Sequence, residues 1–131
     1  MINSGIYDYV NILDKAADAS YLRNEAIANN IANVDTPGYK RVDVDFESLL
    51  TMEIGRTKYT SLDDKVKDVH MDHLNARVSK DMDSYSFSYR LDGNNVDIDT
   101  ENVELAANQI KYQALIDSMS QEMSRIKTAM S

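Results

Sequence analysis

Ala28-Asn29-Asn30-Ile31-Ala32-Asn33-Val34-Asp35-Thr36-Pro37-Gly38-Tyr39-Lys40 is the stretch that decides how this chain is organised. It ends a helical pattern of alanines and asparagines just before the only proline of the 131 residues. The residue before a proline avoids the α region, so a helix must stop there. Thr36-Pro37-Gly38-Tyr39 then predicts a turn, because proline presets φ at the second position and glycine accepts a positive φ at the third.

Toward the N-terminus, apolar and small residues recur at alternating steps of four and three, which is typical of one helix face. This spacing predicts a helix from about Tyr7 to Asn33. Its seam, meaning the face expected to meet another helix, consists of Ile6, Val10, Leu13, Ala17, Ser20, Asn24, Ile27 and Ile31.

The C-terminal third repeats the pattern and predicts a helix from about Thr100 to Ala129, with Asp99 as its N-cap. Its predicted seam consists of Ile98, Asn102, Leu105, Gln109, Tyr112, Ile116, Met119, Met123, Ile126 and Met130. Two helices with matching seams are expected to pair as a coiled coil. Asn24 and Gln109 are the amides expected to be buried, because they lie on the two seams.

The middle of the chain is less regular. Residues 41–46 alternate polar and apolar, which predicts a short strand, and residues 46–52 predict a turn or two of helix. Residues 57–84 are highly charged, and a solvated or partly flexible segment is expected. Tyr85, Phe87, Tyr89 and Leu91 alternate with polar residues before a turn at Asp92-Gly93-Asn94, and Val96 and Ile98 resume the alternation, which predicts a hairpin. The expected fold is mainly α, with segments 1–36, 37–97 and 98–131.

Composition narrows the function. The formal net charge of −8 argues against nucleic acid and against direct binding to anionic lipid. Cysteine is absent, so no disulfide or thiolate metal site is possible. No apolar run approaches the roughly 20 residues of a membrane span, and Met1 to Gly5 do not resemble a cleaved secretion signal.

Chemical sites are weakly indicated. His70 and His73, which are three residues apart with Asp72 between them, could share a helix face and bind a metal, but a third ligand with support is not evident, so solvated side chains are expected. Asp43, Asp45 and Glu47 are interpreted as the polar face of an edge strand rather than as a general acid and base. The expectation is therefore no enzyme, no cofactor and no metal. A small metal-dependent hydrolase using the histidines stays as an alternative.

The two helical seams are rich in alanine, serine, asparagine and methionine, so they bury little apolar area. The isolated chain is therefore expected to be marginally stable and to complete its folding among neighbours. Asn24, Asn29, Asn30 and Asn33 cost helix stability, and their amides are expected to form hydrogen bonds with those neighbours.

The run from Ala28 to Lys40 resembles the N-terminal signature of flagellar basal-body rod proteins. The resemblance extends over Met1 to Phe46, and the segments 92–99 and 105–115 are similar to the proximal-rod member of that family. It implies a structural subunit that polymerises helically into the hollow drive shaft needed for motility. The alternatives are another rod subunit of the same family and a cytoplasmic coiled-coil adaptor.

The resemblance also implies how such a subunit reaches its place. It implies export from the cytoplasm through the flagellar type III export apparatus without a cleaved signal peptide. The implied partners are the chain itself, other rod subunits and a rod-to-ring adaptor protein. The implied assembly motif is Ala28, Asn29, Asn30, Ile31, Ala32, Asn33, Thr36, Pro37, Gly38 and Tyr39.

Overall fold

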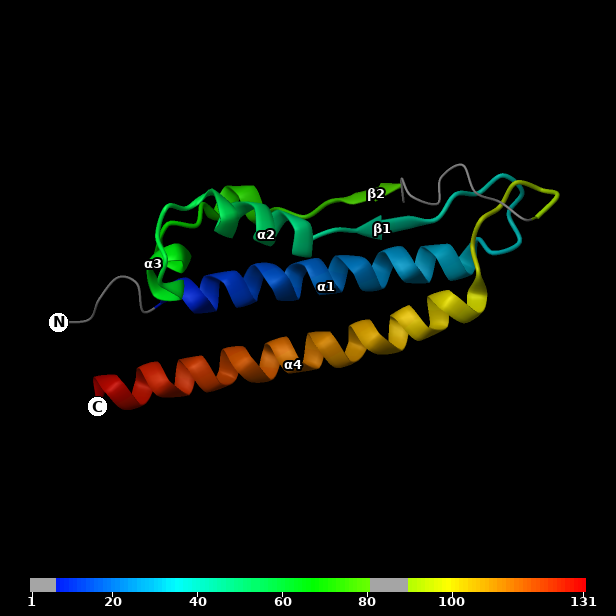
Figure 1. The fold of residues 1–131 in the computed structure, drawn as a ribbon. Helices are drawn as coiled ribbons and strands as arrows, with labels where there is room; N and C mark the ends of the chain where they lie inside the picture. Colours follow the sequence, from blue (N-terminus) through cyan, green and yellow to red (C-terminus); the bar gives the residue numbers. More distant parts are fainter. Residues whose placement is uncertain (1–6, 81–89) are drawn as a thin grey trace.

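Two long antiparallel helices form the body of the molecule in the computed structural model, which describes residues 7–80 and 90–131. α1 (Asp8–Ala32) lies between α4 (Ile98–Met130) and the middle of the chain (Figure 1). The middle consists of β1 (Val42–Val44), α2 (Glu47–Arg56), α3 (Leu62–Lys67), the 3-10 helix η2 (Met71–Leu74) and β2 (Val78–Lys80). The prediction of two paired terminal helices around a β-containing middle is confirmed.

α1 begins and ends within one residue of its predicted bounds, whereas α4 begins two residues earlier than predicted. The predicted N-cap was wrong. Asp97, not Asp99, caps α4, because the Asp97 carboxylate accepts from the backbone N–H groups of Asp99 and Thr100 at 3.0 and 3.4 Å. Both aspartates suit the positive end of the helix, and only the backbone conformation decides between them.

α1 is buried on two faces, and its alanines make this possible. Ala16, Ala19 and Ala26 pack into a core with the middle of the chain, whose buried members there are Val44, Phe46, Val69 and Leu74. Ala17, Ser20 and Ile27 are buried as well. Asn108 of α4 donates to the Ser20 carbonyl at 2.7 Å, so this second face meets α4. Small side chains let a helix approach neighbours closely on both sides.

The predicted seam of α4 was only partly right. Leu105, Ile116 and Met119 are partly buried and Ile126 is buried, but Asn102, Gln109, Tyr112 and Met123 are exposed. Glu101 and Asn108 are buried in their place. The alternating steps of four and three placed the seam at Asn102 and Gln109, each one residue after the position that is buried. Asn24 is partly buried on α1, and Ile6 lies outside the described residues.

The charged segment is more ordered than its composition indicated. It contains α3, η2 and β2, and three of its apolar side chains, Val66, Val69 and Leu74, are buried. β2 pairs antiparallel with β1, with Val44 opposite Val78. Residues 85–89 of the predicted hairpin lie outside the described residues, whereas Ile98, which was expected in its second strand, begins α4. None of the described helices is long and apolar enough to span a membrane.

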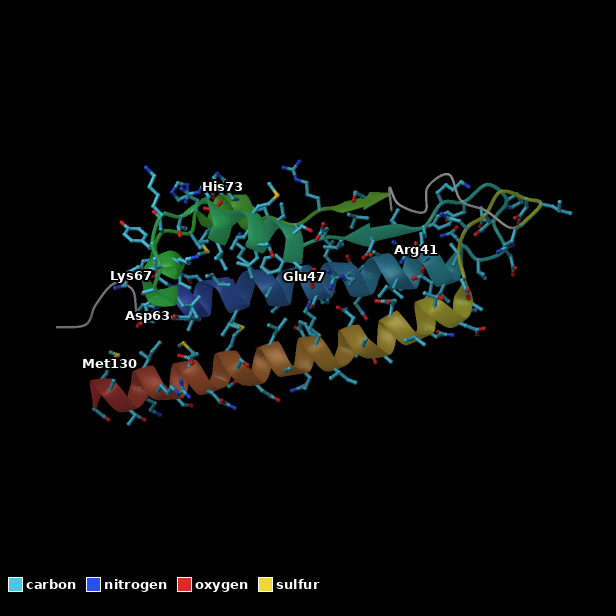
Figure 2. The ribbon with its side chains drawn as sticks, viewed as in Figure 1. Arg41, Glu47, Asp63, Lys67, His73 and Met130 are labelled. Atoms are coloured by element: carbon cyan, nitrogen blue, oxygen red, sulfur yellow. The ribbon has the colours of Figure 1, made fainter. Side chains whose placement is uncertain are left out.

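Ion pairs connect α2 to both long helices. Arg23 of α1 donates two hydrogen bonds to the Glu47 carboxylate, at 3.1 and 2.7 Å, and two to the Val44 carbonyl, at 3.2 and 2.7 Å. Lys111 of α4 contacts the same carboxylate. Glu47 therefore joins three helices, and Figure 2 shows it at the start of α2, next to α1. The two cations outweigh partial burial and hold the pKa of Glu47 at about 2.

A second buried carboxylate, Glu53 of α2, anchors η2. Its Oε1 accepts from Arg56 at 2.9 Å and from the His70 backbone N–H at 2.9 Å, and its Oε2 lies 2.7 Å from Nδ1 of His73. The Arg56 hydrogen bond is the main reason that the pKa of Glu53 falls to about 2. The side chain is 4% exposed, so these bonds replace its water.

Glu53 predicts how stability depends on pH. Its folded pKa of about 2 lies below the ordinary 4.5, so its stabilising contribution is present above about pH 5 and is lost as the pH falls toward 2. In urea unfolding followed by circular dichroism at pH 6, 4 and 3, Glu53→Gln should be less stable than wild type at pH 6 and lose less stability on acidification. Glu25→Gln, which removes an exposed carboxylate of α1, serves as the control. Parallel pH profiles for wild type and Glu53→Gln would contradict the prediction.

Candidate assembly site at the end of the first helix

Asn30 lies at the centre of the sequence motif and is completely buried. Its amide nitrogen donates to the Val42 carbonyl at 2.8 Å and to Oε2 of Glu101 at 3.2 Å. Its amide oxygen accepts from the Val42 N–H at 2.9 Å and from the Tyr39 hydroxyl at 3.1 Å. An asparagine side chain has two donor and two acceptor positions, and all four are used here. Asn30 thus joins α1, the turn, β1 and α4.

The Glu101 carboxylate completes this contact from the first turn of α4. It is 1% exposed, and its Oε1 accepts from Nε of Arg41 at 2.7 Å while its Oε2 accepts from Asn30. Burial and the Glu101 charge raise the pKa of Tyr39 above its ordinary value, and the Tyr39 hydroxyl donates to Asn30. A buried carboxylate is tolerated because a cation and an amide both satisfy it. Figure 2 shows Arg41 beside the ends of α1 and α4.

Asn94 closes the C-terminal end of α1. It is completely buried, and its amide nitrogen contacts three carbonyl oxygens, those of Asn33 at 2.8 Å, Val34 at 3.1 Å and Thr36 at 2.8 Å. The last carbonyls of a helix lack partners within the helix, so a donor at this point stabilises the helix end. The Asn94 oxygen accepts from the Val96 N–H at 2.7 Å, which fixes the orientation of the amide.

Two glycine turns face each other next to this cap. The Tyr39 N–H donates to the Thr36 carbonyl at 3.2 Å and Gly38 has φ +74°, which confirms the predicted turn. Gly93 has φ +78°, and the Gly38 N–H donates to the Asp92 carbonyl at 2.7 Å. Both conformations favour glycine. We call the buried residues Asn30, Asn94, Asn95 and Glu101, together with the partly buried Arg41, the asparagine junction. Asn95 belongs to it because its side chain accepts from the Arg41 N–H at 2.8 Å.

The predicted motif residues divide between this junction and the surface. Asn30 is inside, and Asn33, Ile31 and Tyr39 are partly buried. The Asn33 side chain donates to the Asn29 carbonyl at 2.8 Å within α1. The exposed members are Ala28, Asn29, Ala32, Thr36, Pro37 and Gly38. The amides of Asn30 and Asn33 are therefore bonded within the chain, and not left open for a neighbour as expected.

Sequence reasoning missed Arg41, Asn94, Asn95 and Glu101 as parts of this site. Around the last three of these residues, the sequence predicted only the turn at Asp92-Gly93-Asn94 and a helix start at Asp99. The available signal was the pair of asparagines at 94 and 95 directly before a helix, since asparagine bonds readily to nearby backbone. Their partners lie about sixty residues away in the sequence, and a local sequence pattern cannot indicate which distant residues will be in contact.

Residues 16–40, which include most of α1 and the first glycine turn, match the family model described as flagella basal body rod protein. The chain is also 38% identical over 118 residues to the flagellar basal body rod protein FlgB of Bacillus subtilis, covering 90% of this chain and 89% of the relative. The chain belongs to the FlgB family of flagellar basal body rod proteins.

Other FlgB proteins support this membership. The FlgB of Buchnera aphidicola is 34% identical over 106 residues, and that of Escherichia coli K12 is 34% identical over 104 residues. These matches cover 79% and 75% of this chain, and 80% and 75% of the relatives. The chain is thus a structural rod subunit of the flagellar basal body. The relatives carry the names of structural proteins, which fits a role without catalysis.

The asparagine junction predicts which motif asparagine matters for the subunit itself. Asn30→Ala should lower the free energy of unfolding by at least about 2 kcal/mol, because it removes the hydrogen bonds to both backbone groups of Val42 and one hydrogen bond to the buried Glu101 carboxylate. Asn29→Ala is the matched control, since Asn29 is exposed and alanine favours helix. Thermal unfolding of the two purified variants measures the difference. Equal melting temperatures would show that the junction does not hold the fold.

Proposed function

We propose that this rod subunit contacts its neighbours through two surfaces, the outer face of α4 and the tip formed by the two glycine turns. The neighbours are further copies of the chain, other rod subunits and a rod-to-ring adaptor protein, and together they form a hollow helical shaft. Export through the flagellar type III apparatus without a cleaved signal, with residues 1–36 as the export and assembly segment, belongs to the same proposal.

The exposed apolar side chains of α4 carry this proposal. Val103 and Ile110 are 68% and 72% exposed and lie seven residues apart, so they share a helix face. Among the described residues, α1 is the main neighbour of α4, and the far side of α4 is uncovered in Figure 1. A helix that is covered on one side only and still shows large apolar side chains on the other fits contact with another protein.

The tip provides a second, different surface. Thr36, Pro37 and Gly38 are exposed, and Leu91 on the facing turn is fully exposed. Because Asn94 and the Gly38–Asp92 hydrogen bond hold the two turns together, the tip is positioned by the asparagine junction. A helical polymer needs contacts in which one patch meets a different patch on the next subunit, and two unlike surfaces satisfy that requirement.

A cytoplasmic coiled-coil adaptor would also use an uncovered helix face. Membership in the FlgB family favours the rod, since the relatives that share most of the chain are named as basal-body proteins. The cellular location separates the two functions, because an adaptor is absent from purified basal bodies.

Negative charges introduced on the outer face of α4 test whether this face contacts another subunit. The double variant Val103→Asp and Ile110→Asp should be exported but absent from basal bodies, and swimming should be lost, because buried unpaired carboxylates oppose a subunit contact. The host is a flagellated strain without its own copy of this gene. Immunoblots of the cytoplasm, the periplasm, the medium and purified basal bodies, together with swimming-zone diameters, give the result.

Ser48→Asp is the matched control, because Ser48 is exposed at the start of α2, where an added negative charge suits the helix end. It should swim like wild type. Circular dichroism of the purified double variant confirms that the fold is kept. Normal swimming with both aspartates in assembled basal bodies would exclude the outer face of α4 as a contact surface.

A further inference from the structure

A cluster of two histidines and a glutamate lies in the part of the chain between β1 and β2, apart from the asparagine junction. Glu53 comes from α2, His73 from η2, and His70 directly precedes η2. One ligand atom from each of the three residues lies within 4.8 Å of the others. The His70 and His73 rings are 5.1 Å apart between centroids, at an interplanar angle of 53°. Figure 2 shows His73 near α2, on the side of this segment that faces away from α1.

The Glu53 carboxylate is held so that one oxygen points at the histidines. Arg56 and the His70 backbone N–H occupy Oε1, whereas Oε2 lies 2.7 Å from Nδ1 of His73. Metal-binding carboxylates are typically oriented in this way, with hydrogen bonds from outside the ligand shell. The positive charge of Arg56 opposes a nearby cation, so the affinity should be lower than in a site without it.

The two rings have the freedom to complete the site. In tetrahedral zinc coordination, ligand atoms about 2.0–2.1 Å from the metal lie about 3.3 Å from one another. The three ligand atoms here lie within 4.8 Å of one another, and Nδ1 of His73 is 2.7 Å from Oε2 of Glu53, so the rings must turn to reach the coordination spacing. His70 is exposed and the His73 side chain is 54% exposed, so both rings can turn without repacking the core. Their exposed side also leaves room for water as a further ligand.

We propose that Glu53, His70 and His73 form a binding site for one transition-metal dication of the zinc class. Two imidazoles and one carboxylate are a ligand set that such ions prefer over Mg²⁺ and Ca²⁺, which take oxygen ligands. The sequence indicated the histidines but not Glu53, which lies in α2, 17 residues before His70. Asp72, the acid between the two histidines, is not part of the cluster.

A bound ion would fasten η2 to α2. These elements already meet through Glu53, and a metal that binds only the folded chain stabilises it further as the metal concentration rises above the dissociation constant. The proposed ion would stabilise the part of the chain between β1 and β2. This proposal does not depend on the rod contacts proposed above.

The test uses the full chain without a polyhistidine tag at pH 7.5. Zn²⁺ titration by calorimetry should show saturable binding of one equivalent, Co²⁺ should develop visible d–d absorption, and Zn²⁺ should raise the melting temperature. His70→Gln and His73→Gln should each weaken Zn²⁺ binding at least about tenfold, the scale on which perturbing a metal site lowers its affinity.

Asp72→Asn is the matched control, because it removes an exposed acid from the same short element without touching the cluster, and it should bind Zn²⁺ like wild type. Circular dichroism confirms that the variants keep their helices. Absence of saturable binding by the wild-type chain would overturn the proposal. Undiminished binding by both histidine variants would overturn it too, because the ion would then be held elsewhere.

Discussion

The fully bonded amide of Asn30 is the interaction on which the rest of the structure depends. It contacts both backbone groups of Val42 and thereby places the strand that covers one face of α1. The same amide reaches Glu101 and thereby places the start of the helix that covers the other face. One side chain therefore sets the position of both layers against the central helix. Because the side chain is planar and every position is used, neither layer can shift without leaving a buried polar group unpaired.

The reliance on polar contacts follows from the composition of α1. Its buried positions are mostly alanine with one serine and one isoleucine besides Asn30, and such side chains fit many registers almost equally well. A buried polar pair discriminates between registers, since a slip exposes an unpaired group to an apolar surface. Asn108 with the Ser20 carbonyl and Glu101 with Asn30 are two such pairs along α4. The Oδ1 atoms of Asn24 and Asn108 lack a hydrogen-bond partner among the described residues, so this interface is not fully optimised.

The sequence was sufficient for the elements whose cause is local. Helix periodicity, the stop before Pro37 and the glycine turn were predicted, because each depends on residues within a few positions. The α4 seam was misassigned where its buried members are Glu101 and Asn108, since burial of a polar residue depends on a partner elsewhere in the chain. The order of the charged segment 57–84 was underestimated over its described residues 57–80 for a related reason. Val66, Val69 and Leu74 are too few for a periodic pattern, yet each fills a place in the core.

The position of Asn30 also changes what the motif means for a rod subunit. An asparagine-rich helix end suggests a surface whose amides bond to a neighbouring subunit. The structure instead buries Asn30 and leaves Pro37, Gly38 and Leu91 exposed at the tip. The same short stretch therefore contains residues that define the subunit and residues that are free to meet a neighbour. A substitution of Asn30 is expected to lower the stability of the isolated chain, whereas a substitution of Pro37 or Leu91 is expected to change it little. Gly38 belongs to both groups, because it is exposed but its φ of +74° favours glycine. Loss of assembly alone does not distinguish the groups, so the stability of the monomer is the quantity that separates folding from contact.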